Sequence, residues 1–192
     1  VVAMLSIGEG AKLEALEQIR LMGVNNIIIR AKPPSSTTQT KSKAKANFST
    51  GLVALDADAI VEICPEVDAA VPQWEKVAQA QVDGEQEEVR VIGTTPGFLA
   101  AFAYEVGAGR FLSKENLAGQ ETVCVIGRDV KNALFRFANP IGRSMKIDKQ
   151  WFTVIGVMAG QIAPSKKMEN LEVRNLNMDV YIPLTTAQSK ME

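Results

Sequence analysis

Residues 76–93 read KVAQAQVDGEQEEVRVIG, and this stretch decides how the middle of the chain folds. Within it, Asp83-Gly84 separates two runs in which apolar and polar residues alternate. An Asp-Gly pair between alternating runs is typical of a two-residue turn that joins antiparallel strands. The stretch therefore predicts a β-hairpin whose strands cover Lys76–Val82 and Glu87–Gly93.

Upstream of this hairpin, the apolar pattern predicts a helix, a strand and a second helix. Apolar residues recur at helical spacing over residues 11–22, and Gly23 is a natural stop for that helix. Residues 24–30 are rich in β-branched side chains, which favour a strand. The second helix is predicted over Asp56–Cys64, because Pro65 ends it. After the opening helix, the first half thus reads strand, helix, strand, strand.

The second half continues this mixture of elements. Helices are predicted over residues 98–104 and 128–137, and strands over 123–127, 143–148, 151–158 and 178–183. Glu105–Leu112 reads as a glycine-rich loop, and a further helix is expected to start at Leu184. Lys149-Gln150 would join its two neighbouring strands as a second hairpin. Helices mixed with antiparallel hairpins predict an α+β fold, arranged in two lobes.

The composition is that of a globular domain, and it excludes several classes of function. Of the 192 residues 46% are hydrophobic, and a net charge of −1 leaves no basic field of the kind that nucleic-acid binding requires. No apolar run approaches the ~20 residues that cross a bilayer. The chain has no histidine, which removes the commonest general base and the commonest metal ligand.

The two cysteines, Cys64 and Cys124, do not form a metal-binding pattern. They lie far apart in the sequence, and neither belongs to a Cys-x-x-Cys pair, so a zinc site built from cysteine and histidine is excluded. Cys124 lies in the apolar run Val123–Ile126, where a buried free thiol is expected. Whether the two cysteines form a disulfide is left open by the sequence.

Two short motifs that resemble binding sites have a structural explanation. Gly107-Ala-Gly109 lacks the third glycine of a dinucleotide fingerprint and the Lys-Ser/Thr of a phosphate loop, so nucleotide binding is not expected. Asp56 and Asp58 point to different faces of the predicted helix. They stand at its start, where carboxylates cap the backbone and favour the helix dipole.

Further polar clusters do not assemble a catalytic site either. Glu85, Glu87 and Glu88 make an acidic tip on the predicted hairpin, and solvation is the expected state of that tip. Residues 165–167, Ser-Lys-Lys, do not have the spacing of a Ser-Lys dyad. No nucleophile, base and orienting group come together in the sequence. We therefore predict no catalytic residue, no cofactor-binding residue and no metal ligand, and we expect that the chain is not an enzyme.

Two segments differ in composition from the rest of the chain. Residues 32–50 are rich in Pro, Ser, Thr and Lys, and residues 160–177 are also polar. Segments with so little to bury are expected to be solvated loops. For residues 32–50 the alternative is a contact arm for a partner protein.

A series of segments along the chain points to one family. The series is LSIGEGA (5–11), LMGVNNIII (21–29), GAGRFL (107–112), VIG (125–127), LF (134–135), NPIG (139–142), FTVIGV (152–157) and DVYIPLTT (179–186). In order and spacing these segments resemble the extracytoplasmic domain of MacB-type ABC transporter permeases. The resemblance covers nearly the whole chain and departs from the family mainly at residues 32–50 and 160–177.

The resemblance implies how the chain is organised and where it lies. Residues 1–22 would be a stalk helix that continues transmembrane helix 1, and the chain would enter transmembrane helix 2 just after Glu192. The chain would thus lie on the periplasmic side of the bacterial inner membrane, as the soluble domain of a membrane protein. The implied lobes are a porter-like β-α-β lobe of residues 1–93 and 172–192, and an inserted smaller sabre lobe, of mixed α/β structure, of residues 94–171.

The resemblance also implies a mechanical role. An ATPase domain outside this chain would hydrolyse ATP, and the periplasmic lobes would transmit the resulting motion and dock a periplasmic adaptor (membrane fusion) protein for efflux. Through the adaptor the transporter would reach an outer-membrane channel, and the intact transporter would be a homodimer. The contact features expected are residues 32–50, the hairpin tip near Asp83-Gly84, and Gly107–Leu112. Gly107, Gly109, Pro140 and Gly142 are expected to fix backbone geometry.

Two alternatives to an efflux permease stay open at this point. The first is a lipoprotein-release or cell-division relative of the same superfamily, which would engage a lipoprotein chaperone or an activator of peptidoglycan hydrolases. The second is a stand-alone enzyme or small-molecule binding protein. This second alternative requires a concave pocket with convergent polar groups.

Overall fold

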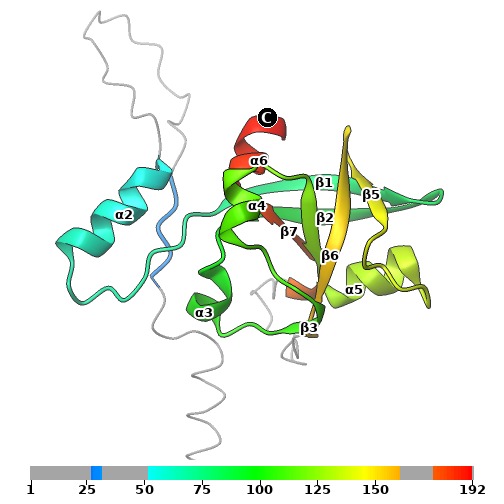
Figure 1. Cartoon of the computed structure of the whole chain (residues 1–192), viewed down its shortest axis with the longest axis horizontal. Helices are drawn as coiled ribbons and strands as arrows, with labels where there is room; N and C mark the ends of the chain where they lie inside the picture. The colour runs from blue at the N-terminus through cyan, green and yellow to red at the C-terminus, as the bar shows by residue number, and fades with distance from the viewer. Residues whose placement is uncertain (1–26, 32–51, 161–174, 192) are drawn as a thin grey trace, which may run out of the picture. The chain divides into compact units, whose positions relative to one another are not determined.

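The computed structural model describes residues 27–31, 52–160 and 175–191. Contacts within the chain divide it into two units, residues 1–70 and residues 71–192, and each unit is described by itself. The predicted stalk helix and the segment 32–50 lie outside the described residues. Figure 1 follows the described elements in chain order.

The first unit contains the helix α2, Ala54–Ile63, which confirms the helix predicted over 56–64. Asp56 caps it as expected, since its Oδ2 accepts a hydrogen bond from the Val53 N–H at 2.7 Å. The strand predicted over residues 24–30 is wrong in its described part, because residues 27–31 have no regular secondary structure. Ile27 is 87% exposed, and no described strand pairs with this stretch. β-branched residues favour a strand only when a neighbouring strand is available to accept and donate the hydrogen bonds.

The second unit begins with the predicted hairpin. Its strands are β1 (Trp74–Val82) and β2 (Glu85–Thr94), which pair in register from Trp74 opposite Gly93 to Val82 opposite Glu85. Asp83 and Gly84 have positive φ angles of 48° and 92°. Two successive positive φ angles match the two-residue hairpin turn that an Asp-Gly pair favours. The hairpin prediction is confirmed.

The remaining elements follow in chain order. They are α3 (Phe98–Phe102), β3 (Val106–Gly109), α4 (Lys114–Ala118), β4 (Val123–Ile126), α5 (Arg128–Val130), the π-helical turn η1 (Lys131–Phe135), β5 (Ser144–Ile147), β6 (Gln150–Met158), the 3-10 turn η2 (Leu176–Met178), β7 (Asp179–Pro183) and α6 (Leu184–Lys190). The predicted helices near residues 98 and 184 and the four predicted strands are confirmed within a few residues. Sequence reasoning took β3 for a loop and missed α4.

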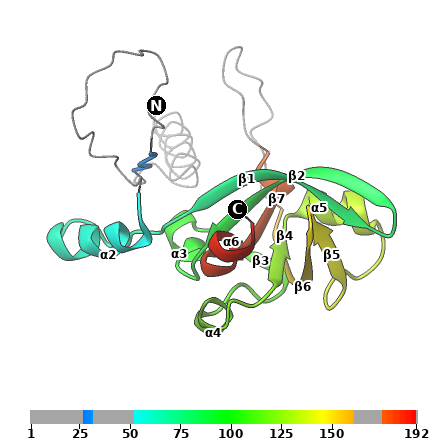
Figure 2. The same ribbon diagram turned by 90° about the horizontal axis from the view of Figure 1, so that it is seen from above.

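Six of the seven strands form a closed ring. The strand order is β3-β6-β4-β7-β2-β1-β5, and β5 pairs with β6 as well. The β4–β6 and β2–β7 pairs are parallel, and the others are antiparallel. β5 and β3 occupy successive stretches along the same side of β6, opposite β4. The ring therefore runs β6-β4-β7-β2-β1-β5, and β3 is attached outside it (Figures 1 and 2).

The fold is α+β, as the sequence predicted. Strands from both sides of the expected lobe boundaries at 93/94 and 171/172 belong to this one sheet, because β4 pairs with β7 and β5 pairs with β1. The division into a porter-like lobe and an inserted sabre lobe at those residues stays a prediction.

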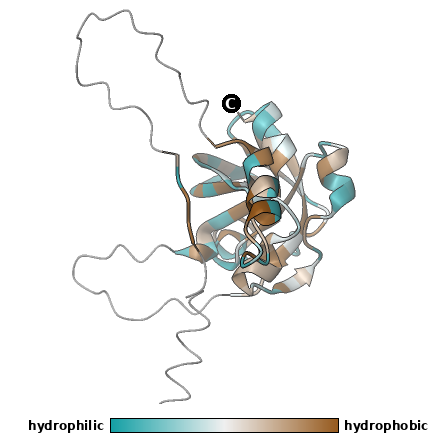
Figure 3. Ribbon diagram, turned by 90° about the vertical axis from the view of Figure 1, so that its left-hand side faces the viewer, coloured by the Kyte–Doolittle hydropathy of each residue, from teal (hydrophilic) through white to brown (hydrophobic). Residues whose placement is uncertain are grey.

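Two hydrophobic clusters pack on the two faces of the sheet. Successive residues of β7 belong to different clusters: Val180 and Ile182 pack in one, and Tyr181 packs in the other. In Figure 3 hydrophobic residues (brown) and hydrophilic residues (teal) are interspersed along the ribbon. In the second cluster the Phe98 ring lies 5.0 Å from the Tyr181 ring and 6.2 Å from the Phe111 ring. Burial of each such side chain contributes about 1.5–3 kcal/mol.

Candidate functional site

The described residues contain no cluster of acidic residues and cysteines that could hold a metal ion. Residues 165–167 lie outside the described residues. Gly107 and Gly109 belong to the outer strand β3, where a glycine is needed at 109 because its φ is 76°. The backbone at Gly109 is therefore in line with its predicted role, whereas Gly107 has no positive φ and its predicted role stays a prediction.

Both cysteines are free in the structure, so the disulfide that the sequence left open is not formed. Cys124 is fully buried in β4, as predicted, and this burial raises the pKa of its thiol. A raised pKa keeps the thiol protonated at neutral pH, and a protonated thiol is a poor nucleophile. Cys64 is exposed at the end of α2.

The acidic hairpin tip is tied to the loop after η1. Glu85 Oε1 lies 2.6 Å from Arg136 Nη2, and Asp83 Oδ2 lies 3.9 Å from Arg143 Nη1. The carboxylates of these two pairs are more than half exposed. Exposed ion pairs contribute little to the free energy of folding. The hairpin tip is therefore a solvated surface that carries two weak ion pairs.

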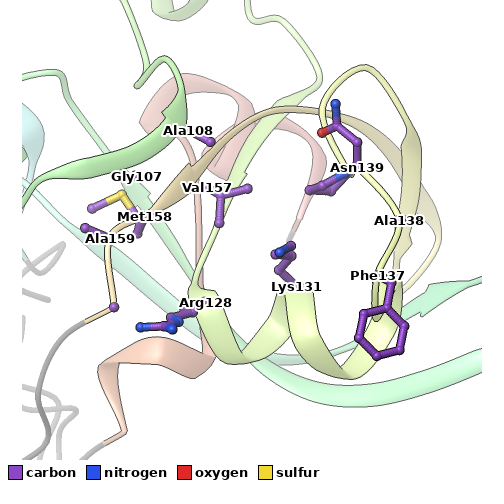
Figure 4. Close-up of a pocket in the computed structure, with 12 residues that line it drawn as sticks. Gly107, Ala108, Arg128, Lys131, Phe137, Ala138, Asn139, Val157, Met158 and Ala159 are labelled. Carbon is purple, nitrogen blue, oxygen red and sulfur yellow. The ribbon is translucent and has the colours of Figure 1, made fainter.

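A groove of about 520 Å³ lies between the β3–β6 pair and the helical turn α5–η1. Figure 4 shows Val157 in the middle of this groove, with Arg128 and Lys131 on the helical side. The loop after η1 closes one end with Phe137 and Asn139. We call this feature the β3 groove.

Local backbone geometry places the cations of the β3 groove. Gly127 ends β4 and starts α5 at once, and its N–H donates to the Asp179 carbonyl at 2.9 Å. A Cβ at position 127 would overlap the Asn177 carbonyl, so this tight exit from the strand requires glycine. Arg128 is the first residue of α5, and Lys131 follows three residues later, on the same side of the helical turn.

The other end of the π-helical turn places the aromatic ring. Arg136 ends η1 with a φ of 51°, and the next side chain, Phe137, is 104% exposed. The loop then turns back, since the Ile141 N–H donates to Asn139 Oδ1 at 3.1 Å and Gly142 has a φ of 82°. The positive φ of Gly142 agrees with the prediction that this residue fixes the backbone, and the same role of Pro140 stays a prediction.

The β3 groove is cationic. The side chains of Arg128 and Lys131 form no ion pair or hydrogen bond with any residue that the structure describes. Asp129 lies between them in sequence, but its Oδ2 accepts a hydrogen bond from Asn175 Nδ2 at 3.0 Å. Among the described lining residues none carries a carboxylate.

Sequence reasoning found only part of the β3 groove. It named Gly107–Leu112 as a contact feature, and Gly107 and Ala108 do line the groove. It missed Arg128, Lys131 and Phe137, because it treated residues 128–137 as one ordinary helix. A phenylalanine two residues before the turn-forming Asn139-Pro140 was the available signal for an exposed ring.

A second polar feature joins α6 to the segment around α4. The Thr185 hydroxyl donates to the Leu117 carbonyl at 2.7 Å, and the Thr186 hydroxyl donates to the Glu121 carbonyl at 2.9 Å. Asn116, which is 2% exposed, donates from Nδ2 to Glu121 Oε2 at 2.6 Å. We call these contacts the α4–α6 clamp, and Figure 2 shows the two helices near each other.

Comparisons with known proteins agree with one another. A family model described as the MacB-like periplasmic core domain matches residues 1–192. The macrolide export ATP-binding/permease protein MacB of Azoarcus sp. is 31% identical over 191 residues, which are 100% of this chain and 27% of that protein. The pyoverdine export ATP-binding/permease protein PvdT of Pseudomonas entomophila is 29% identical over 166 residues, 86% of this chain and 24% of that protein.

A solved structure has the same fold. The periplasmic region of MacB from Actinobacillus actinomycetemcomitans aligns with a TM-score of 0.67 and 19% identity, over 93% of this chain and 73% of that one. The chain spans about a quarter of the length of the curated relatives it matches. In the part of the chain that the structure describes, every helix is too short or too polar to span a membrane.

Proposed function

The chain belongs to the family of MacB-like periplasmic core domains, and on this premise we propose that it transmits ATP-driven motion across the membrane and docks a periplasmic adaptor protein. As a member of this family it is a periplasmic domain of an ABC exporter permease. The proposal adds that the intact transporter is a homodimer and that the adaptor connects it to an outer-membrane channel. ATP hydrolysis itself would take place in another domain.

The observation that supports a mechanical role is the route from α6 into the sheet. β7 runs into α6 without an intervening loop, and β7 lies between β2 and β4 in the closed ring. All five residues of β7 are buried. Motion that reaches α6 would therefore be passed to the whole sheet, because the central strand cannot shift alone without breaking its pairing on both sides.

The α4–α6 clamp supports the same role. It joins α6 to the segment that leads into β4, through hydroxyl groups that donate to backbone carbonyls. These hydrogen bonds hold α6 in one orientation relative to the sheet. A lever that transmits motion requires such fixed attachments more than it requires reactive side chains.

Export is favoured over lipoprotein release or cell division by the relatives, because both named relatives are export proteins. Their names give two chemically different cargoes, a macrolide and pyoverdine. We therefore propose export without assigning a cargo.

The mechanical role is tested in the full transporter that contains this chain, reconstituted in vesicles with its adaptor. The variant Thr185→Val/Thr186→Val removes the clamp hydroxyls, and Ser189→Ala on the same helix is the matched control, since the Ser189 hydroxyl is bonded only within α6. We expect the double variant to hydrolyse ATP normally but to transport at a rate several-fold lower. Unchanged transport in a correctly folded double variant would contradict transmission through the clamp.

Docking is tested by titrating a fluorescently labelled periplasmic adaptor protein onto the transporter in nanodiscs. We expect the adaptor to bind the whole transporter and to lose this binding when the domain is deleted. A second variant replaces residues 32–50 with a Gly-Ser link, because that segment is a proposed contact arm. Equal adaptor binding with and without this domain would overturn the docking role.

A further inference from the structure

The cations of the β3 groove lack the carboxylate partner that three arginines of the second unit have. Arg90, Arg136 and Arg143 each have a carboxylate within 4 Å. Arg128 and Lys131 have none among the described residues, although they sit one helical turn apart. Two unpaired cations on one side of a groove create a positive field that attracts carboxylates.

Arg128 lies beside the backbone of Gly160, where an added Cβ would be 2.7 Å from Nη1. Both residues line the β3 groove. The absence of a side chain at position 160 therefore leaves room for the guanidinium at the edge of the groove.

Phe137 supplies an apolar contact at the end of the same groove. Its ring is fully exposed, although burial would contribute about 1.5–3 kcal/mol. The backbone beside it forms a turn, in which the Ala138 N–H donates to the Phe135 carbonyl at 2.8 Å, and the preceding Arg136 pairs with Glu85. An exposed aromatic ring is typical of residues that anchor a protein partner.

The strand β3 offers a third kind of contact. Among the described strands it pairs with β6 alone, and its sequence is Val-Gly-Ala-Gly. Small side chains leave room for another chain to approach, and an outer strand presents unpaired N–H and C=O groups. Such edges accept an extended segment of a partner as an additional strand.

We propose that the β3 groove docks an extended acidic segment of a partner protein. Carboxylates of that segment would lie over Arg128 and Lys131, an apolar side chain would pack against Phe137, and the backbone would run along β3. The positive charge of Arg128 and Lys131 favours an acidic ligand. The exposed Phe137 ring and the open edge of β3 favour a peptide segment over a small anion. This inference rests on the proposed function, because the partner that we expect in the groove is the periplasmic adaptor protein.

The test uses the full transporter in nanodiscs and its fluorescently labelled adaptor, with fluorescence anisotropy as the readout. The variants are Arg128→Glu/Lys131→Glu and, independently, Phe137→Ser. Lys149→Glu is the matched control, because Lys149 is an exposed cation in the β5–β6 turn and outside the groove. All four substituted residues are at least partly exposed, so the variants are expected to fold, which thermal unfolding of each will check.

We expect the double charge reversal to weaken adaptor binding at least tenfold, Phe137→Ser to weaken it severalfold, and Lys149→Glu to leave it unchanged. Binding to the wild type should also weaken as salt rises, because exposed ion pairs are screened. Lysine substitutions in an acidic segment of the adaptor should restore affinity for the double variant. That restoration would identify the segment that occupies the groove.

Three outcomes would overturn the docking of an acidic segment. If all variants bind the adaptor as the wild type does, the groove is not the site, while the proposed function stands. If the wild-type transporter does not bind the adaptor, the proposed docking function fails and this inference fails with it. If the double variant loses affinity for the adaptor only in nanodiscs that contain phosphatidylglycerol, the groove binds a lipid headgroup instead.

Discussion

The methyl group of Ala187 lies against the Cα of Gly93, so that a methyl group at position 93 would occupy the same space. This contact seats α6 on β2, close to the Thr185 and Thr186 hydroxyls of the α4–α6 clamp. The absence of a side chain at position 93 is therefore what allows the helix to approach the sheet.

Gly93→Ala is expected to destabilise the domain by about 1–3 kcal/mol, because an added methyl group in a packed interface forces the backbone to shift. The control is Gly97→Ala, where the nearest atoms to an added Cβ are 3.8 Å away. Urea unfolding of the full chain with each substitution measures the difference. Equal midpoints for the two variants would show that α6 moves away without cost.

Asn116→Leu is expected to lower the free energy of unfolding by about 1–3 kcal/mol, because it removes several hydrogen bonds that the buried amide makes with its neighbours. Asn116 Oδ1 accepts from Arg110 Nη1 at 2.9 Å and from the Ser113 N–H at 3.0 Å, and Nδ2 donates to Glu121. Asn132→Leu on the exposed side of η1 is the control. Denaturant titration of both variants is the measurement, and a change confined to Asn132→Leu would contradict this role for Asn116.

Cys124 should make stability depend on pH in the alkaline range. Burial raises the pKa of its thiol, so the native state keeps the proton while an unfolded thiol loses it above about pH 8.5. Its contribution to stability is therefore complete below that pH and is lost as pH rises, by up to about 1.4 kcal/mol per unit. Urea unfolding between pH 7 and pH 10 should show this decline.

Cys124→Ala is expected to flatten the alkaline decline, and Cys64→Ala should leave it intact, because Cys64 is exposed. A thiol reagent should likewise label only Cys64 until denaturant is added. Rapid labelling of Cys124 in the native domain would contradict the buried, protonated thiol.

The sequence predicted those elements whose cause is local. The hairpin at Asp83-Gly84 follows from two residues that tolerate positive φ, and the α2 cap follows from one carboxylate near the helix start. β3 could not be predicted in this way, because Val-Gly-Ala-Gly has no strand preference of its own and becomes a strand only where β6 provides a partner. The strand predicted around Ile27 is wrong for the opposite reason. Its β-branched residues favour a strand, but no described strand pairs with them.

The candidate site was harder to predict than the fold. The β3 groove draws Ala108, Arg128, Phe137 and Val157 from separate elements, and only the closed sheet brings them together. The decisive local feature is the wide π-helical turn, which ends by pointing Phe137 into solvent. A helical pattern over residues 128–137 does not distinguish such a turn from an ordinary helix.

The position of β7 has a consequence for biosynthesis. β7 is the last strand in the chain, but it fills the place between β2 and β4. Until residues 179–183 have left the ribosome and crossed the membrane, both neighbouring strands present an open edge with unpaired backbone groups. The ring cannot close during synthesis, and its folding must wait for a contact between distant parts of the sequence. A chain stalled before Asp179 would thus be a template for aggregation, and periplasmic chaperones that cover strand edges should associate with this domain late in its translocation.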